Sequence, residues 1–197
     1  MAEQETRTHI LAAATAVFAE KGFANASMND IMQAAGLSKG GIYWHFNSKD
    51  EIIATIFQQY FEVQLHNLEI SLAEEGSASE KVTRLVQSVS NDIEAFSHQF
   101  PSSLEFYELA SKNEDLREQM REFFLSYRQR VELLAREAIA VGEWVALPPT
   151  EIANTILGLF EGILLISSVF PEQINMGTQM ETAADLLLSG LKKNISE

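Results

Sequence analysis

The chain has 197 residues, 46% of them hydrophobic, which suffices for one medium domain or for a small domain joined to a larger one. A formal net charge of −14 argues against a protein that binds nucleic acid through overall basicity. The absence of cysteine excludes disulfides, thiolate metal sites and cysteine nucleophiles.

The charge is unevenly distributed along the chain. Residues 1–50 carry a net charge of −1 and the remainder carries −13, because the first segment holds Arg7, Lys21, Lys39 and Lys49 against Glu3, Glu5, Glu20, Asp30 and Asp50. The cations of that segment therefore need only be presented on one face to meet a phosphate backbone. The opening residues MAEQETRTHI lack the cationic and apolar regions of a signal peptide, which predicts a cytoplasmic protein.

Helical periodicity begins near the N-terminus and indicates four helices before residue 73. Apolar residues at three- and four-residue spacings predict a first helix over 5–21, with Gly22 as its C-terminal cap. Ser27 is a natural N-cap for a short helix that Gly36 ends, and Ser38 can cap a second short helix that runs to residue 44. Ser48 opens a long amphipathic helix over 48–72.

The same periodicity continues to the C-terminus, and no segment alternates as a strand does. The expected helices are 78–100, 102–112, 114–141, 150–170 and 178–193. Gly76, Pro101, Gly142, the pair Pro148-Pro149 and Pro171 punctuate them. The predicted fold class is all-α.

One helix, over 152–170, is apolar enough to resemble a membrane span. A carboxylate at the centre of a span costs about 2.5–3.5 kcal/mol, and Glu161 occupies that position. Flanking basic residues are also missing. We therefore expect a buried helix outside any membrane, which approaches another helix through Gly158 and Gly162.

The stretch 34–50, AAGLSKGGIYWHFNSKD, has the proportions of the second half of a helix-turn-helix. Gly36 permits the tight turn, and apolar residues on either side would lock both short helices against the first helix. The second short helix would then present Lys39, Tyr43 and Trp44 outward, where Lys39 suits a guanine or a phosphate. The alternative is that GGIYWHF is a packed hydrophobic corner, although two adjacent glycines in a helix cost roughly 2 kcal/mol relative to alanines.

The segments ILAAA…VFAEKGF, S-M-x-D-I, AAGLSKG and IYWHF followed by S-K resemble the N-terminal domain of the TetR family of bacterial transcriptional regulators, most of all its AcrR-like members. The resemblance covers about the first 60 residues. It implies a three-helix helix-turn-helix DNA-binding domain at 4–64 and a larger helical ligand-binding and dimerisation domain at 65–197. It also implies a homodimer that binds a palindromic operator in double-stranded DNA and represses nearby genes until a small molecule binds.

Carried over by position, the resemblance implies eight DNA contacts: Ser27, Ser38, Lys39, Gly40, Tyr43, Trp44, His45 and Lys49. One departure is that the first short helix offers only Asn29, Asp30 and Gln33, where many relatives carry basic residues. Phosphate would repel Asp30 unless that side chain caps the helix. We therefore expect modest DNA affinity with a strong dependence on salt.

The C-terminal part is rich in aromatic residues, each of which taken alone is more often core than ligand contact. Together they favour an apolar effector cavity, for which the resemblance implies a place between the helices at 78–100, 102–112, 114–141 and 150–170. The candidate lining residues are Phe96, Tyr107, Phe123, Tyr127, Glu161 and Leu164. Glu161 needs a partner, which could be Arg128, Arg130, a ligand amine or a second subunit. An apolar or aromatic effector, such as an acyl chain or a drug-like cation, is expected.

The last two helices are predicted to form the dimer interface, with apolar area from Leu186, Leu187, Leu188 and Leu191. A two-fold dimer would place two recognition helices roughly 34–36 Å apart or at a larger related spacing.

No cofactor, metal site or enzymatic activity is expected. The four histidines lack metal-ligand spacing, and no phosphate-binding glycine loop or nucleophile elbow is present. A helical module that has lost DNA binding stays open as an alternative, and so does activation in place of repression.

Overall fold

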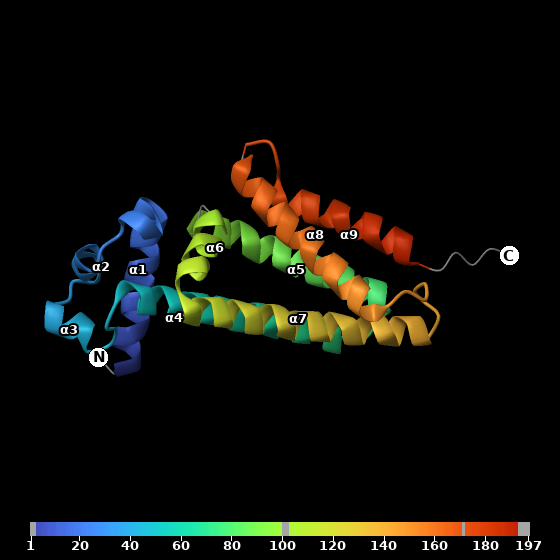
Figure 1. Cartoon of the computed structure of the whole chain (residues 1–197), viewed down its shortest axis with the longest axis horizontal. Coiled ribbons are helices and arrows are strands. Elements are labelled where there is room, and N and C mark those ends of the chain that lie inside the picture. Colours follow the sequence, from blue (N-terminus) through green and yellow to red (C-terminus); the bar gives the residue numbers. More distant parts are fainter. Residues whose placement is uncertain (1–2, 100–102, 171, 193–197) are drawn as a thin grey trace.

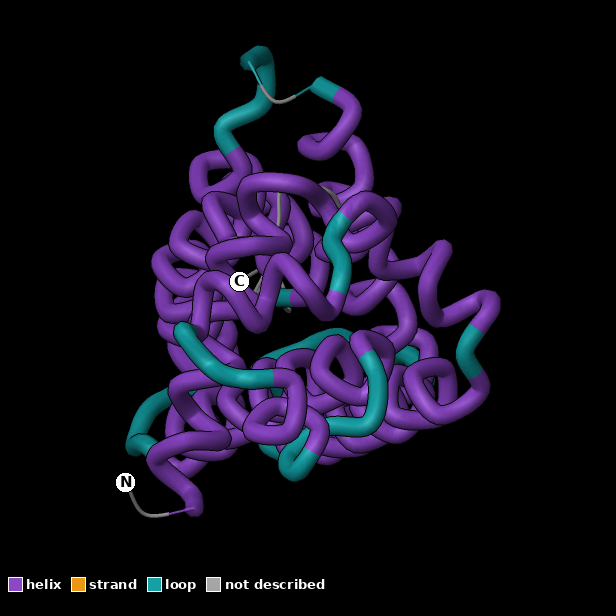
Figure 2. Tube along the Cα trace, turned by 90° about the vertical axis from the view of Figure 1, so that its left-hand side faces the viewer, coloured by secondary structure: helices purple, strands orange, loops and turns teal. Residues whose placement is uncertain are grey.

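The computed structural model describes residues 3–99, 103–170 and 172–192, and for residues 91–99 and 103 it describes the backbone alone. Within these residues the regular structure is helical, in nine helices joined by short loops (Figures 1 and 2). Their bounds are α1 Glu3–Asn25, α2 Met28–Ala35, α3 Lys39–Tyr43, α4 Lys49–Ala73, α5 Ala78–Gln99, α6 Ser103–Lys112, α7 Glu114–Ala140, α8 Pro149–Val169 and α9 Met176–Leu191. The predicted all-α class is confirmed.

Side-chain caps begin the three helices that follow α1. The hydroxyl oxygens of Ser27, Ser38 and Ser48 each accept a hydrogen bond from the backbone N–H three residues later, so all three predicted N-caps are confirmed. The start of α9 was predicted wrongly, because Asn175 is its cap and the helix begins at Met176, two residues before Thr178. The expected last residue of that helix, Lys193, lies outside the described residues.

Helix α1 does not stop at Lys21 as predicted. It changes direction at Gly22, whose φ of 73° and ψ of 163° are non-helical, and then makes one more turn to Asn25. A side chain at this φ would be strained, so glycine is the residue that lets the chain bend here. The bend brings Phe23 back onto the core, where its ring centroid lies 5.0 Å from that of Phe18.

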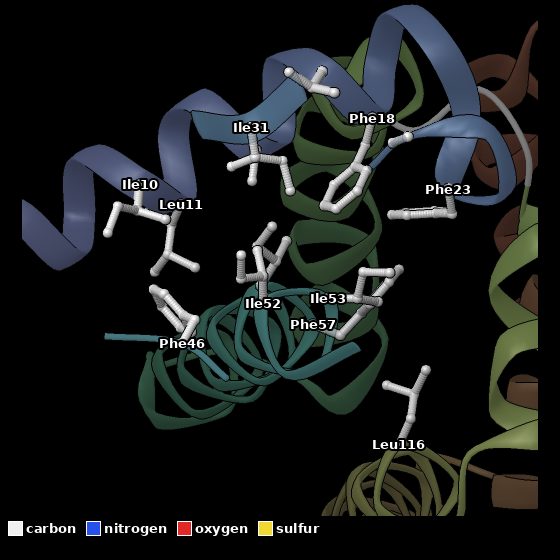
Figure 3. Close-up of a cluster of buried hydrophobic side chains, with 14 of the residues drawn as sticks. Ile10, Leu11, Phe18, Phe23, Ile31, Phe46, Ile52, Ile53, Phe57 and Leu116 are labelled. Atoms are coloured by element: carbon white, nitrogen blue, oxygen red, sulfur yellow. The ribbon is translucent and has the colours of Figure 1, made fainter. Parts of the chain in front are cut away.

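A first hydrophobic cluster joins α1, α2, α3 and the beginning of α4 (Figure 3). Ile10, Ile31, Ile42, Phe46 and Ile52 are completely buried in it. Burying each such side chain contributes roughly 1.5–3 kcal/mol relative to exposure. Figure 3 also places Leu116 below Phe57, so α7 reaches this cluster from the other part of the chain.

A second cluster lies among α5, α7, α8 and α9 and includes the buried indole of Trp144. The indole N–H donates to the hydroxyl of Ser79 over 3.1 Å, which satisfies its only polar group. Helix α4 runs beside α7 from the first cluster to the second (Figure 1). Residues 64 and 65, between which the predicted domain boundary falls, both lie inside this helix. The division at 4–64 and 65–197 therefore stays a proposal.

Among the described helices, α8 is the one with the length and mean hydropathy, 1.8, of a membrane span. It packs into the second cluster through Ile152, Ile156 and Ile163 and is a core helix. A single chain buries only one of its faces, however, since 28% of its apolar stretch is buried. The predicted close approach at Gly158 and Gly162 is not made within the chain, because a Cβ at either glycine would meet nothing within 4 Å.

Candidate functional site

Helices α2 and α3 meet at a tight turn whose hydrogen bonds account for its shape. Gly36 has the left-handed conformation, with φ 64° and ψ 27°, and its N–H donates to the carbonyl of Gln33. The N–H of Leu37 donates to the carbonyl of Met32 over 3.1 Å. The helix-turn-helix predicted for the two short helices around Gly36 has this geometry.

Two polar contacts that the sequence reasoning missed hold α1 in place against the short helices and α4. His9 Nε2 lies 2.9 Å from the carbonyl oxygen of Ala35, at the end of α2. The guanidinium of Arg7 lies 4.8 Å from the centroid of the Phe46 ring and donates to the hydroxyl of Thr55. Neither residue stands in a local pattern that would have indicated its partner.

Helix α3 presents a row of polar and aromatic groups to solvent. Lys39, Tyr43 and Trp44 are exposed, Trp44 to 78%, and the ammonium of Lys39 lies 5.7 Å from the centre of the Tyr43 ring. Gly40 is exposed with nothing within 4 Å of the place of its Cβ, while His45 is half-buried. This surface offers one cation, a phenol and an indole N–H beside bare backbone, a set that suits phosphates and base edges.

Ser27 and Asp30 are engaged with each other. The Ser27 hydroxyl accepts from the Asp30 N–H, and the Asp30 carboxylate accepts from the Ser27 backbone N–H over 2.9 Å, which closes a capping box. The Ser27 hydroxyl also donates to that carboxylate over 2.6 Å. Lys21 pairs with the same carboxylate at 2.6 Å. The hydrogen bond from Lys21, followed by those from Ser27, holds the pKa of Asp30 far below its usual range. Asp30 therefore caps α2, and it also neutralises one cation of this domain.

Lys49 contacts the main chain of its own domain, which differs from the expected phosphate contact. Its ammonium donates to the carbonyls of Phe23 and Ala26, over 2.6 and 2.8 Å, and the residue is half-buried. Two of its three donors are thereby used inside the protein. In this geometry Lys49 ties the end of α1 and the loop before α2 to the start of α4.

A second constellation forms where α6, α7 and α8 meet. The phenol of Tyr107 donates to the Glu161 carboxylate, and Tyr127 lies close enough for that carboxylate to raise its pKa. Burial is the main cause of the raised pKa of Tyr107, Tyr127 and Glu161. The structure thus brings together three of the predicted lining residues.

The other predicted lining residues have separate surroundings. Phe123 stacks on Phe61 of α4 with a centroid distance of 4.5 Å, and Leu164 packs against the second cluster. The side chain of Phe96 lies outside the described residues. Arg130 is not the partner of Glu161, because its Nε donates to Glu69 over 3.0 Å. Arg128 has a buried Nε for which the described residues provide no hydrogen-bond partner.

Helix α6 connects the two regions through three consecutive residues. Glu105 accepts the backbone N–H of Phe23 over 3.1 Å, across 82 residues of sequence. Phe106 stacks on Phe57 with a centroid distance of 4.0 Å, and Tyr107 turns to Glu161. Figure 1 shows α6 standing between α1 and the helices of the C-terminal part. Successive helical residues point about 100° apart, so one short helix can contact three elements.

An exposed recognition helix on a compact three-helix unit, followed by a helical C-terminal part, defines a DNA-binding regulator. Residues 10–56 match the family described as bacterial regulatory proteins, tetR family. These residues thus form the DNA-binding domain of TetR-family transcriptional regulators.

Relatives and solved structures agree over most of the chain. It is 26% identical to the uncharacterised HTH-type transcriptional regulator YfiR of Bacillus subtilis, over 87% of this chain and 84% of that one. SmeT, the repressor of the Stenotrophomonas maltophilia multidrug efflux pump SmeDEF, is 25% identical, with a TM-score of 0.72 over 96% of this chain and 91% of that one. The transcriptional regulator FadR of Bacillus subtilis, in complex with stearoyl-CoA, shares the fold at 23% identity, with a TM-score of 0.78 over 93% and 98% of the two chains.

Proposed function

We propose that this DNA-binding regulator is a cytoplasmic repressor that binds a palindromic operator as a homodimer and leaves it when a small apolar or aromatic effector binds. The observation that carries the proposal is the exposed face of α3, where Lys39, Tyr43 and Trp44 stand free of the core that holds the helix. Exposed aromatic side chains beside a cation are costly to solubility and are expected where a partner covers them.

The proposed DNA contacts divide into two groups by their geometry. Lys39, Gly40, Tyr43 and Trp44 are accessible and reach the groove or its phosphates directly, with Ser38 and His45 at the two ends of α3. Ser27 and Lys49 use their side-chain donors within the protein, and so they contribute by holding the helices at the correct angle.

The homodimer is supported by a bare stripe on α8. Leu165, Ile166 and Val169 are 40–54% exposed. Gly158 and Gly162, which are four residues apart, lie on the same face with open space above them. Leu186 of α9 adds an apolar side chain that is 71% exposed. A second copy of α8 and α9 would cover this surface, and the glycines would let two helix backbones approach closely.

An effector is supported by the partly buried polar cluster at Tyr107, Tyr127 and Glu161, which lies among apolar helices. Two structures of the same fold bear names that connect them to small molecules, since one is in complex with stearoyl-CoA and the other represses a multidrug efflux pump. A small-molecule effector at this cluster fits both the geometry and these relatives.

Selection from fragmented genomic DNA of the source organism, sequenced after retention on the purified protein at several salt concentrations, tests the proposal. A shared palindrome is expected, and its position relative to the promoter separates repression from activation. Lys39→Ala should lose this enrichment, whereas Lys112→Ala, an exposed lysine of α6, should keep it. Equal enrichment of the palindrome by both variants would refute the proposal. So would the absence of any enriched palindrome with the purified protein and also with its ligand-stripped, refolded form.

A further inference from the structure

Glu161 is an acidic residue in the middle of the most apolar helix of the chain. It is half-buried, and its carboxylate accepts the hydrogen of the Tyr107 phenol. Burial raises the pKa of this carboxyl, while the hydrogen bond from Tyr107 opposes the rise. The Glu161 carboxylate is therefore a hydrogen-bond acceptor in a poorly solvated environment, where an apolar side chain would cost less free energy.

No basic group among the described side chains pairs with Glu161. Two arginines of α7 form ion pairs with other residues. Arg130, a predicted partner of Glu161, pairs with Glu69, and Arg136 pairs with Glu132. Arg128 contributes its charge to Glu132, whose pKa is lowered chiefly by Arg136. A partly buried carboxylate that is held by a single neutral donor is left with unused acceptor capacity.

Two tyrosines lie beside this charge, Tyr107 in a hydrogen bond with the carboxylate and Tyr127 close enough for the carboxylate to raise its pKa, and each is next to a phenylalanine ring. Tyr107 lies 5.8 Å from Phe106, and Tyr127 lies 6.0 Å from Phe123, measured between ring centroids. Burial raises the pKa of both tyrosines, so the phenols stay neutral at ordinary pH. A carboxylate beside neutral aromatic rings attracts a cation by its charge, and a ring face adds to this attraction where the cation lies over it.

We propose that the effector is an organic cation with apolar or aromatic substituents, whose charge lies against Glu161 between the rings of Tyr107 and Tyr127. This inference rests on the proposed function and names the ligand class of its effector site. An anionic ligand head, such as that of an acyl-CoA, would be repelled by Glu161 and does not fit this position. The preference differs from that of the Bacillus subtilis structure in complex with stearoyl-CoA.

Tyr107 gives such a cation a route to the DNA-binding helices. A cation at Glu161 competes with the phenol for the carboxylate and moves Tyr107. Its neighbours Glu105 and Phe106 contact Phe23 and Phe57 of the first cluster, so a displacement of α6 reaches α1 and α4 directly. The cation releases DNA only if it binds the DNA-incompetent state more tightly.

The test compares two probes of similar shape by titration calorimetry, namely the cation tetraphenylphosphonium and neutral triphenylphosphine oxide. The full-length protein should bind the cation about tenfold or more tightly than the neutral probe. Glu161→Gln should remove that preference and leave the affinity for the neutral probe unchanged. Glu161→Asp should retain it. Glu151→Gln, an exposed acid in the first turn of the same helix, is the matched control and should bind as the unmodified protein does.

Equal affinity of the unmodified protein for both probes would overturn the inference even if Glu161→Gln failed to fold. Tight binding of stearoyl-CoA with no binding of the cation would also overturn it. Either result leaves the regulator itself untouched, because operator selection is measured without any probe. If the protein selects no operator but binds the cation through Glu161, the effector class stands and the proposed function fails.

Discussion

Replacing Glu105 with alanine should loosen the contact between helix α6 and the DNA-binding helices. The Glu105 carboxylate accepts the Phe23 N–H over 3.1 Å directly after the bend at Gly22. The bend lets the carboxylate approach, since a Cβ at Gly22 would lie 3.2 Å from its nearer oxygen. The substitution removes this acceptor and leaves the stack of Phe106 on Phe57 in place.

The size of the effect follows from the kind of bond that is lost. A hydrogen bond to a charged group contributes about 1.5–3 kcal/mol, and the half-buried position of Glu105 favours the lower value. Unfolding should therefore become easier by about 1.5 kcal/mol, which for a chain of this size lowers the melting temperature by about 3–6 °C. The Phe23 amide should exchange its hydrogen about tenfold faster if its protection depends on this bond.

Both quantities are measured on the full chain at one protein concentration, because the proposed dimer would make the melting temperature depend on concentration. Hydrogen exchange with residue resolution follows the Phe23 amide, and calorimetry follows the melting temperature. Glu108→Ala is the control on the same helix. Glu108 is exposed and pairs only with Lys112 among the described residues, so its loss should change neither measurement.

The prediction is refuted if the Phe23 amide exchanges at the same rate in Glu105→Ala and in the unmodified protein. It is also refuted if Glu105→Ala and Glu108→Ala lower the melting temperature equally, because the bond to Phe23 would then carry no special weight. A uniform acceleration at all amides would indicate general destabilisation in place of a local release.

Three further predictions address the interface, the dimer and the effector site. Lys39→Ala should lower the slope of log affinity against log salt by about 1 per protomer, measured by fluorescence anisotropy on the selected operator; an unchanged slope would mean that Lys39 touches no phosphate. Gly158→Leu places a side chain in open space of the single chain, so it should leave folding intact and convert the dimer to monomer in analytical ultracentrifugation; a persisting dimer would place the interface elsewhere. Tyr107→Phe removes the donor that favours the charged form of Glu161 and so raises the pKa of that carboxyl. As the pH falls, this variant should therefore lose affinity for tetraphenylphosphonium at a higher pH than the unmodified protein does. Titration calorimetry at a series of pH values measures this, and coincident curves of affinity against pH for the two proteins would refute it.

Local chemistry made the helices and the exposed surface of α3 predictable. A serine cap acts within three residues of sequence, so Ser27 and Ser38 could be read without knowing the fold. The outward position of Lys39 and Trp44 was predictable for the same reason. Helical spacing places these side chains on a different face from the buried Ile42. These features depend on neighbours in the chain.

Partners distant in sequence were not predictable in the same way. Tyr107 meets Glu161 across 54 residues, and Glu105 meets Phe23 across 82. A carboxylate on a helix surface leaves the same pattern whether it is solvated or bonded to another helix. Lys49 illustrates the same limit, because its position next to an N-cap favours a phosphate contact until the fold shows two carbonyls within its reach.

The contacts of the cations in the first 50 residues bear on how the proposed dimer would be controlled. Within the described part of the first 50 residues, Lys21 and Lys49 are bound to groups of the protein and Arg7 lies against the Phe46 ring, so Lys39 is the cation directed outward. One subunit can therefore neutralise few phosphates, and its own DNA affinity must be low. In the proposed dimer, tight binding would then require both copies of α3 at once and would depend on their separation. A small movement of α4, transmitted by α6, would therefore be enough to prevent the second subunit from contacting DNA, whereas a more basic domain would tolerate such a movement.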